Sequence, residues 1–271
     1  MSAVTPALPT LDAPGRVTFS HVLSSEWTKF RSVRSTKWSL GVAIFLVVAV
    51  PLIPAFVTVH HWHNHESLDI KPLEIALPGI FIAQLAIAVL GVLVITPEYS
   101  TGSIRSTFTA VPKRLPVLWA KLLDYALVIL ALMVPAVLVS FFETQAIVSD
   151  VPGMQVSLAT QNIARTLFMA PVYVMLVGVF ALALGAIIRS TAGSIAAFAA
   201  IFFVLPPLTF ILGTSWHDKI NKYLPSTAGD SMWTLRPDST SLSPLAGGLV
   251  LTAYCVAAIL IAAVLVQRRD V

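Results

Sequence analysis

The stretch IALPGIFIAQLAIAVLGVLVITP, residues 75–97, runs for 23 residues without a single Asp, Glu, Lys or Arg. A helix needs about 20 mainly apolar residues to cross the hydrocarbon core of a bilayer. Core helices of soluble proteins seldom stay free of charge over such a length. The stretch therefore predicts a transmembrane helix.

Five similar stretches flank it along the chain. One of them, residues 118–142, carries Lys121 and Asp124 in its first turns, and we expect both side chains to reach out of the apolar layer to the membrane interface. The other four contain no Asp, Glu, Lys or Arg. They are residues 38–59, 166–188, 191–213 and 245–267.

The overall composition agrees with six spans. Hydrophobic types make up 57% of the 271 residues and charged types only 11%, and the mean hydropathy is +0.86. An average soluble domain has about 25% charged residues. The sequence predicts an all-α polytopic membrane domain over residues 18–271, after a flexible tail, residues 1–17, rich in Pro, Ala and Thr.

Basic residues predict the orientation. If the N-terminus lies inside, 12 of the 17 Lys and Arg residues fall on the inner side. Lys and Arg concentrate in cytoplasmic loops. We therefore expect a multi-pass protein of the plasma membrane with both termini in the cytoplasm. The net charge of +4 then reflects this bias and not a nucleic-acid partner.

The segment before the first span, residues 18–36, predicts an interfacial amphipathic helix. Four large apolar side chains recur on one helical face: Phe19, Leu23, Trp27 and Phe30. Such a helix lies in the plane of the membrane and contacts lipid. It is either an anchor for the first span or a surface on which a cytoplasmic partner acts.

The longest cytoplasmic connection begins at Glu98. Glu98 and Arg105 are seven residues apart, two helical turns, so they share one face if the helix is continuous. Gly102 lies between them, and Pro112 and Pro116 end or bend the stretch. The pattern predicts either a functional element or charged anchors at the end of a span.

The stretch between the last two spans, residues 216–243, carries Trp216, Tyr223 and Trp233. Trp and Tyr favour the membrane–water boundary. The stretch is either a partly re-entrant segment or an ordinary loop.

Small residues recur at four-residue spacing in three spans. Such stripes let helix backbones approach closely, within one chain or between two copies. The stripes are Ala181 with Gly185, Ala192 with Ala196 and Ala200, and Ala253 with Ala257.

Four histidines follow the first span: His60, His61, His63 and His65. Histidine-rich tracts can bind zinc, copper or nickel. Closely spaced histidines in a loop more often form a weak, adventitious site, so we expect no physiological metal. Cys255 is the only cysteine, which excludes an intrachain disulfide.

Missing motifs exclude several functions. The chain has no GxxxxGK[ST] phosphate loop and no HExxH, GxSxG or DxDxDG pattern. No unpaired acid or base falls in the middle of a span, where an ion-coupled carrier would need one. We expect no catalytic residue and no cofactor, so the energy for any transport would come from another subunit.

Two stretches resemble a known family. SSEWTKFRSVRSTKW at 24–38 and LGVLVITPEYSTGSIRSTFTAVPKR at 90–114 are similar to actinobacterial ATP-binding cassette (ABC) transporter permeases of the second exporter type. The six-span plan also fits, so the resemblance covers nearly the whole chain. It carries no information on the cargo.

The resemblance implies roles for particular residues. In that family the helix before the first span acts as an elbow, the loop after the second span forms a coupling helix, and short outer helices lie between the last two spans. Two permease chains, here expected to be a homodimer surrounded by membrane lipid, typically pair with two ATPase chains. Pro97 departs from the family pattern, in which a residue other than proline precedes the Glu at this position. The implied elbow residues are Glu26, Trp27, Lys29, Phe30 and Arg31, and the implied coupling residues are Glu98, Tyr99, Gly102, Arg105, Pro112 and Arg114.

The sequence thus predicts the permease subunit of an ABC exporter, moving a hydrophobic or amphipathic solute, that is not itself an enzyme. A non-transporting membrane scaffold or immunity-type protein would satisfy the uncharged spans and the small-residue stripes equally well. A passive channel is a further alternative. A membrane-embedded enzyme is disfavoured because no cluster of catalytic groups is visible.

Overall fold

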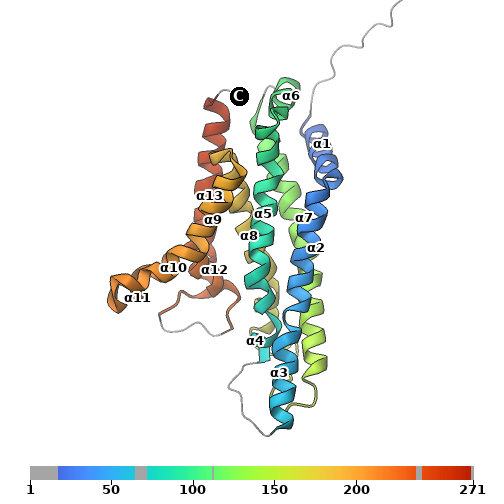
Figure 1. Ribbon diagram of the computed structural model, residues 1–271, viewed down its shortest axis with the longest axis vertical. Coiled ribbons are helices and arrows are strands. Elements are labelled where there is room, and N and C mark those ends of the chain that lie inside the picture. The colour runs from blue at the N-terminus through green and yellow to red at the C-terminus, as the bar shows by residue number, and fades with distance from the viewer. Residues whose placement is uncertain (1–17, 65–71, 112, 236–239, 270–271) are drawn as a thin grey trace, which may run out of the picture.

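The computed structural model describes residues 18–64, 72–111, 113–235 and 240–269, which form helices and turns without a strand. The all-α prediction is confirmed, and the predicted tail, residues 1–17, lies outside the described residues. The α-helices are α1 (Phe19–Ser32), α2 (Arg34–Ala49), α3 (Leu52–His63), α4 (Pro72–Ala76), α5 (Pro78–Ser100), α6 (Ser103–Ala110), α7 (Leu115–Ile147), α8 (Ile163–Ile188), α9 (Thr191–Ala199), α10 (Leu205–Leu208), α11 (Thr214–Ile220), α12 (Pro225–Trp233) and α13 (Pro244–Arg268) (Figure 1).

Six helical segments of the described chain are long and apolar enough to cross a membrane, as predicted. α2 and α3 together form the first, Arg34–His63, and the segment Thr191–Ile211 forms the fifth. The others are α5, α7, α8 and α13. α7 has 33 residues and begins at Leu115. Its length of about 50 Å exceeds the hydrocarbon core, so it extends beyond the apolar layer.

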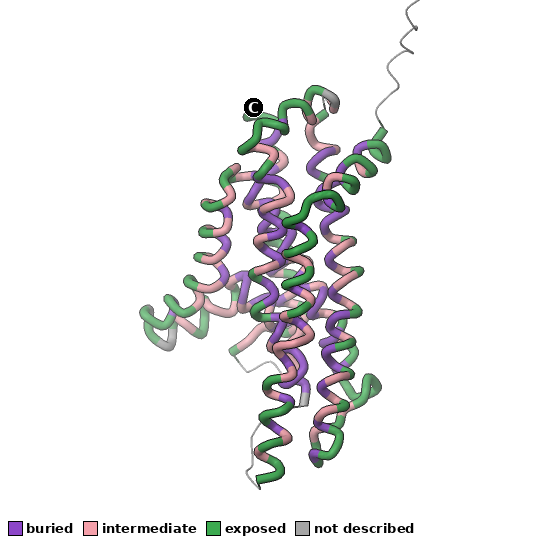
Figure 2. Tube along the Cα trace, turned by 45° about the vertical axis from the view of Figure 1, so that its right-hand side comes forward, coloured by how far each residue is buried: buried purple, intermediate pink, exposed green. Residues whose placement is uncertain are grey.

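The first described turn of α1, helix α6 and the last turn of α13 lie at one end of the bundle, here called the α6 end (Figure 1). An even number of spans returns the chain to the side from which it started. The inner helices carry most of the buried residues, and the outer helices are largely exposed (Figure 2). Exposed apolar helix surfaces are expected where lipid is the solvent.

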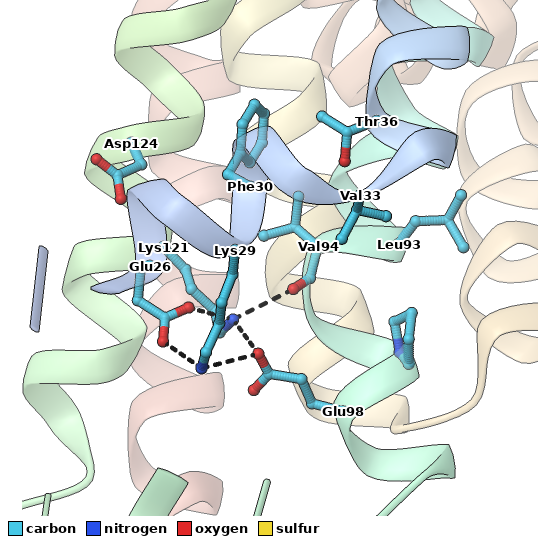
Figure 3. Close-up of a pocket in the computed structure, with 11 residues that line it drawn as sticks. Glu26, Lys29, Phe30, Val33, Thr36, Leu93, Val94, Glu98, Lys121 and Asp124 are labelled. Atoms are coloured by element: carbon cyan, nitrogen blue, oxygen red, sulfur yellow. Dashed lines mark hydrogen bonds and ion pairs between the residues drawn. The ribbon is translucent and has the colours of Figure 1, made fainter. Parts of the chain in front are cut away.

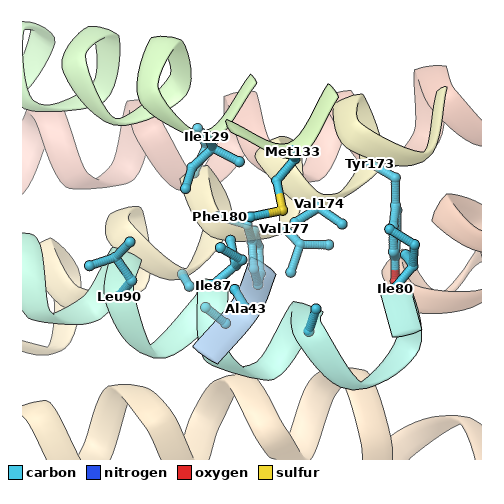
Figure 4. Close-up of a cluster of buried hydrophobic side chains, with 14 of the residues drawn as sticks. Ala43, Ile80, Ile87, Leu90, Ile129, Met133, Tyr173, Val174, Val177 and Phe180 are labelled. Atoms are coloured by element: carbon cyan, nitrogen blue, oxygen red, sulfur yellow. The ribbon is translucent and has the colours of Figure 1, made fainter. Parts of the chain in front are cut away.

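α5 and α8 cross closely at the centre of the bundle because each has a glycine at the contact. A Cβ on Gly91 would collide with the carbonyl of Gly178, and a Cβ on Gly178 would collide with the Tyr125 side chain. Tyr125 is fully buried, and its hydroxyl donates to the carbonyl of Ile87 at 2.7 Å. Met133 and other apolar side chains fill the space around the crossing (Figure 4).

Of the three small-residue stripes, only the one on α8 is buried within the chain. Ala181 and Gly185 lie in the core. The stripes on the fifth and sixth spans are exposed: Ala192 with Ala196 and Ala200, and Ala253 with Ala257.

The fifth span leaves the bundle partway along its length. Its first part packs on α8 through Phe198 and Phe202, whose rings stack with centroids 4.5 Å apart. After the π-helical turn Ala200–Val204, Pro206 and Pro207 supply no N–H, and the helix continues only in short pieces. The resulting arm, α10 and α11, projects sideways from the bundle (Figure 1).

The segment 216–243 contains a packed helix, α12, which lies against α8 and α13. Gly229 touches the Tyr173 ring so closely that no Cβ would fit. Arg165 of α8 donates to the carbonyls of Met232 and of the residue after α12 at 3.1 and 3.2 Å. A basic side chain at a helix C-terminus satisfies carbonyls that the helix itself leaves without donors.

Candidate functional site

The α6 end holds a cluster of four charged side chains, here called the charged junction: Glu26 and Lys29 of α1, Glu98 of α5 and Lys121 of α7 (Figure 3). Lys121 Nζ lies 2.6 Å from Glu26 Oε2 and 2.7 Å from Glu98 Oε1. It also donates to the Val94 carbonyl at 3.3 Å. The side chains of Lys121 and Glu26 are each only 3% exposed. This ion pair is therefore shielded from water.

The prediction that the side chains of Lys121 and Asp124 extend outward from the helix bundle is wrong. Lys121 is buried within the junction, and Asp124 is only 6% exposed. Two carboxylates from other helices lie close to Lys121, so the ammonium has no need to extend toward the headgroups.

Lys29 extends the junction to α6. Its Nζ lies 2.7 Å from Glu26 Oε1, 3.3 Å from Glu98 Oε1 and 3.3 Å from Thr107 Oγ1 of α6. Burial lowers the pKa of Lys29, but the hydrogen bonds and negative charges of Glu26 and Glu98 outweigh it and raise the pKa above its ordinary value. Lys29 therefore stays protonated at neutral pH, and the junction joins α1, α5, α6 and α7.

α1 occupies the segment predicted to be an amphipathic helix and docks on α7. Val22 and Phe30 are buried, and the Phe30 ring meets Tyr125 edge-on with centroids 6.4 Å apart. Phe19 and Trp27 stay exposed. The predicted apolar face is therefore divided. Because α1 packs against the helix bundle, Phe30 is buried in the core, while Trp27 remains on the surface.

Glu98 and Arg105 do not share a helical face. α5 ends at Ser100 and α6 begins at Ser103, and Gly102 between them has a φ of +73°. Residues with a Cβ avoid this left-handed conformation, so glycine permits the turn. Glu98 joins the junction, while Arg105 is exposed on α6. The prediction of a shared face is wrong because the helix is interrupted.

α6 lies on the bundle through one face only. Ile104 is buried, and Phe108 packs into a small apolar cluster with Val22 and Ala120. The opposite face is polar and exposed: Ser103, Arg105, Ser106 and Thr109. This face of α6 is therefore not covered by any other described part of the chain.

Arg114, at the start of α7, connects α6 to the end of α13. Its guanidinium donates to the carbonyls of Val266 at 3.2 Å and Arg269 at 2.9 Å. Its charge also lies over the Phe108 ring of α6, 5.4 Å from the centroid. The last carbonyls of a helix carry partial negative charge, so an arginine there is favourable.

The remaining implied residues have different positions. Tyr99 is partly buried, with the Arg189 guanidinium 4.8 Å from its ring centroid. Arg31 is exposed at the end of α1. Pro112 lies outside the described residues.

Of the four histidines of the 60–65 tract, the three that the structure describes, His60, His61 and His63, lie on α3 and not in a loop. His61 Nδ1 and His63 Nδ1 each lie 2.8 Å from a backbone carbonyl one turn earlier. His65 lies outside the described residues. Within the described ranges, no group of three His, Cys, Asp or Glu side chains could hold a metal ion.

Sequence reasoning missed Lys121, Asp124 and Thr107 as members of this site. A signal was present, because ionisable residues inside a span mark functional sites more often than anchors. Lys121 and Asp124 are also three residues apart, a spacing that places both on one face of α7. Thr107 carried no such signal.

Comparison with known proteins finds no family model that matches this chain and no significant match among curated proteins.

Proposed function

We propose that this chain is the membrane-spanning permease subunit of an ABC exporter and moves a hydrophobic or amphipathic solute across the plasma membrane. A separate ATPase subunit supplies the energy, and the chain itself catalyses no reaction. The resemblance of residues 24–38 and 90–114 to that family supports the proposal, together with the six candidate spans.

The observation that carries the proposal is the link between α6 and the membrane helices. α6 presents a polar face to solvent, and on its other side Thr107 contacts Lys29. Ion pairs of 2.6–3.3 Å continue this contact to α1, α5 and α7. Loss of one partner from the buried Lys121–Glu26 pair, which joins α1 to α7, costs about 3–5 kcal/mol. α6 itself follows α5 after a two-residue turn and packs on the bundle through Ile104 and Phe108, so a partner that displaces α6 would move the attached helix ends together, as coupling requires.

The proposal places the α6 end in the cytoplasm, with both termini, because most of the Lys and Arg residues that the structure describes lie there. It also pairs two copies of the chain. The exposed stripes at Ala192–Ala196–Ala200 and Ala253–Ala257 offer surfaces on which helix backbones can approach closely.

The test is reconstitution of the chain with the ATPase encoded by a neighbouring reading frame. ATP-dependent transport of a fluorescent amphipathic dye and the ATPase rate are measured on the same vesicles. Arg105→Ala should leave expression and membrane insertion unchanged, because Arg105 is exposed, and should sharply lower transport. Lys219→Ala, which removes an exposed cation from α11, is the matched control and should transport normally.

Each alternative has its own outcome. A chain that binds no ATPase and supports no flux is a scaffold or immunity-type protein. Flux that is independent of ATP indicates a passive channel. Normal transport by Arg105→Ala would remove the exposed face of α6 from the mechanism.

A further inference from the structure

A cavity of about 100 Å³ lies beside the charged junction, between α1, α2, α5 and α7 (Figure 3). Five charged side chains line it: the four of the junction and Asp124. Phe30, Val33 and Leu93 contribute to an apolar part of the wall. Three acids and two lysines leave the cavity with one negative charge in excess.

All N–H donors of the two lysines at the cavity already have acceptors. An ammonium group has three N–H donors. Lys121 directs its donors to Glu26, Glu98 and the Val94 carbonyl. Lys29 directs its donors to Glu26, Glu98 and Thr107. All six donors are therefore engaged within the junction.

Acceptors at the cavity, in contrast, are left without donors. Asp124 is 6% exposed, and its Oδ2 is buried with no hydrogen-bond partner. Glu98 Oε2 is buried and unpartnered in the same way. Pro97 has no N–H, so the Leu93 carbonyl lacks its usual donor within α5. A buried carboxylate oxygen without a donor is costly, and a cation with N–H groups would remove that cost.

The cavity reaches the surface at the membrane boundary. Val33 and Pro97, which line it, are both exposed. Trp27 and Trp38, on either side of Val33 in the sequence, are 42% and 76% exposed. Exposed Trp residues favour the interface between lipid and water. A molecule dissolved in the adjacent leaflet can therefore approach from the side.

We propose that this cavity binds the protonated amine of a cationic amphiphile, with the ammonium at Asp124 and the first carbons beside Phe30, Val33 and Leu93. The inference rests on the proposed function, to which it adds the substrate class. A cavity of this size holds a head group, roughly three water-sized units, so the rest of the tail stays in the membrane. A neutral or anionic head group would leave Asp124 without a counter-charge.

The test is binding of radiolabelled dodecylamine to the full chain in nanodiscs of zwitterionic lipid, with empty nanodiscs as background. Unlabelled dodecylamine should compete, whereas equal concentrations of dodecanol, which has no charge, and methylamine, which has no tail, should not. Asp124→Asn keeps the side-chain size and should weaken binding about tenfold. Val33→Trp should block the exposed mouth of the cavity and abolish binding.

Glu143→Gln is the matched control. Glu143 is also on α7 and also has a buried oxygen without a partner, but it does not line the cavity, so its variant should bind like wild type. Wild-type binding by both Asp124→Asn and Val33→Trp would overturn the inference. Equal competition by methylamine would also overturn it, because the site would then take any small cation.

The binding assay needs neither ATP nor the ATPase. Binding without transport would therefore contradict only the proposed function. Transport without dodecylamine binding would contradict only this site.

Discussion

Replacing Lys121 by methionine removes the buried cation of the charged junction while keeping an unbranched side chain of similar length. Glu26, 3% exposed, and Glu98, 15% exposed, then lose a cation that lay within 2.7 Å of both. Removing one partner of a buried ion pair costs about 3–5 kcal/mol, because a charge stays buried and uncompensated. Lys29 remains beside both carboxylates, so we expect the lower end of that range, about 3 kcal/mol.

Lys29→Met is the matched variant. Lys29 contacts the same two carboxylates, but its side chain is 40% exposed, so water screens the interaction. Exposed ion pairs contribute about 0–1 kcal/mol. The two variants therefore separate the effect of burial from the identity of the partners.

The assay is thermal unfolding of the purified chain in detergent. One kcal/mol shifts the melting temperature of a large domain by about 2–4 °C. We expect Lys121→Met to melt roughly 6–12 °C below wild type and Lys29→Met at most roughly 4 °C below it. Adding Glu26→Gln and Glu98→Gln to Lys121→Met should recover much of the loss, because no buried charge then lacks a partner. Equal shifts in the two lysine variants, or no recovery in the triple variant, would refute the assignment of a buried charged junction.

Three further predictions follow from burial and close contact. Trp27→Asp should preserve the melting temperature and lower transport, because Trp27 is exposed. Phe30→Asp should lower the melting temperature, because it places a carboxylate against the Tyr125 ring. Equal melting temperatures of the two variants would contradict the difference in burial between these two residues of α1. Gly178→Ala should destabilise the bundle by about 1–3 kcal/mol in thermal unfolding, because the added Cβ collides with Tyr125. Gly41→Ala is the control and should not destabilise the bundle, because its Cβ meets nothing within 4 Å. Burial raises the pKa of Asp230 from 3.8 to about 7 despite its hydrogen bond with Tyr173, so the folded protein holds this proton more tightly than the unfolded chain does. Stability should therefore fall as the pH rises from about 4 to about 7, and Asp230→Asn should remove that part of the slope of melting temperature against pH; an unchanged slope would contradict the burial of the charge.

The amphipathic segment and the polar connection show how far local pattern predicts a site. The sequence identified α1 and the region of α6 as the informative segments, because charges and aromatic residues at helical spacing are local features. It placed Glu98 and Arg105 on one face of a continuous helix, whereas in the folded chain Glu98 forms ion pairs with Lys29 and Lys121. Pairing by spacing assumes a continuous helix, and the left-handed turn at Gly102 interrupts it.

The sequence by itself determined that this is an all-α membrane protein with six candidate spans. The reason is local: each stretch of about 20 apolar residues must satisfy its own backbone hydrogen bonds in lipid, and a helix does so without help from distant residues. Only the tertiary structure decided that Lys121 is buried, that Asp124 has a carboxylate oxygen without a donor, and that α12 packs into the bundle. These properties depend on which helix ends meet in space. Contacts between segments far apart in the chain decide which helix ends lie together; for example, Gly91 and Gly178 let α5 and α8 approach closely. The spacing of residues along one segment carries no information on such contacts.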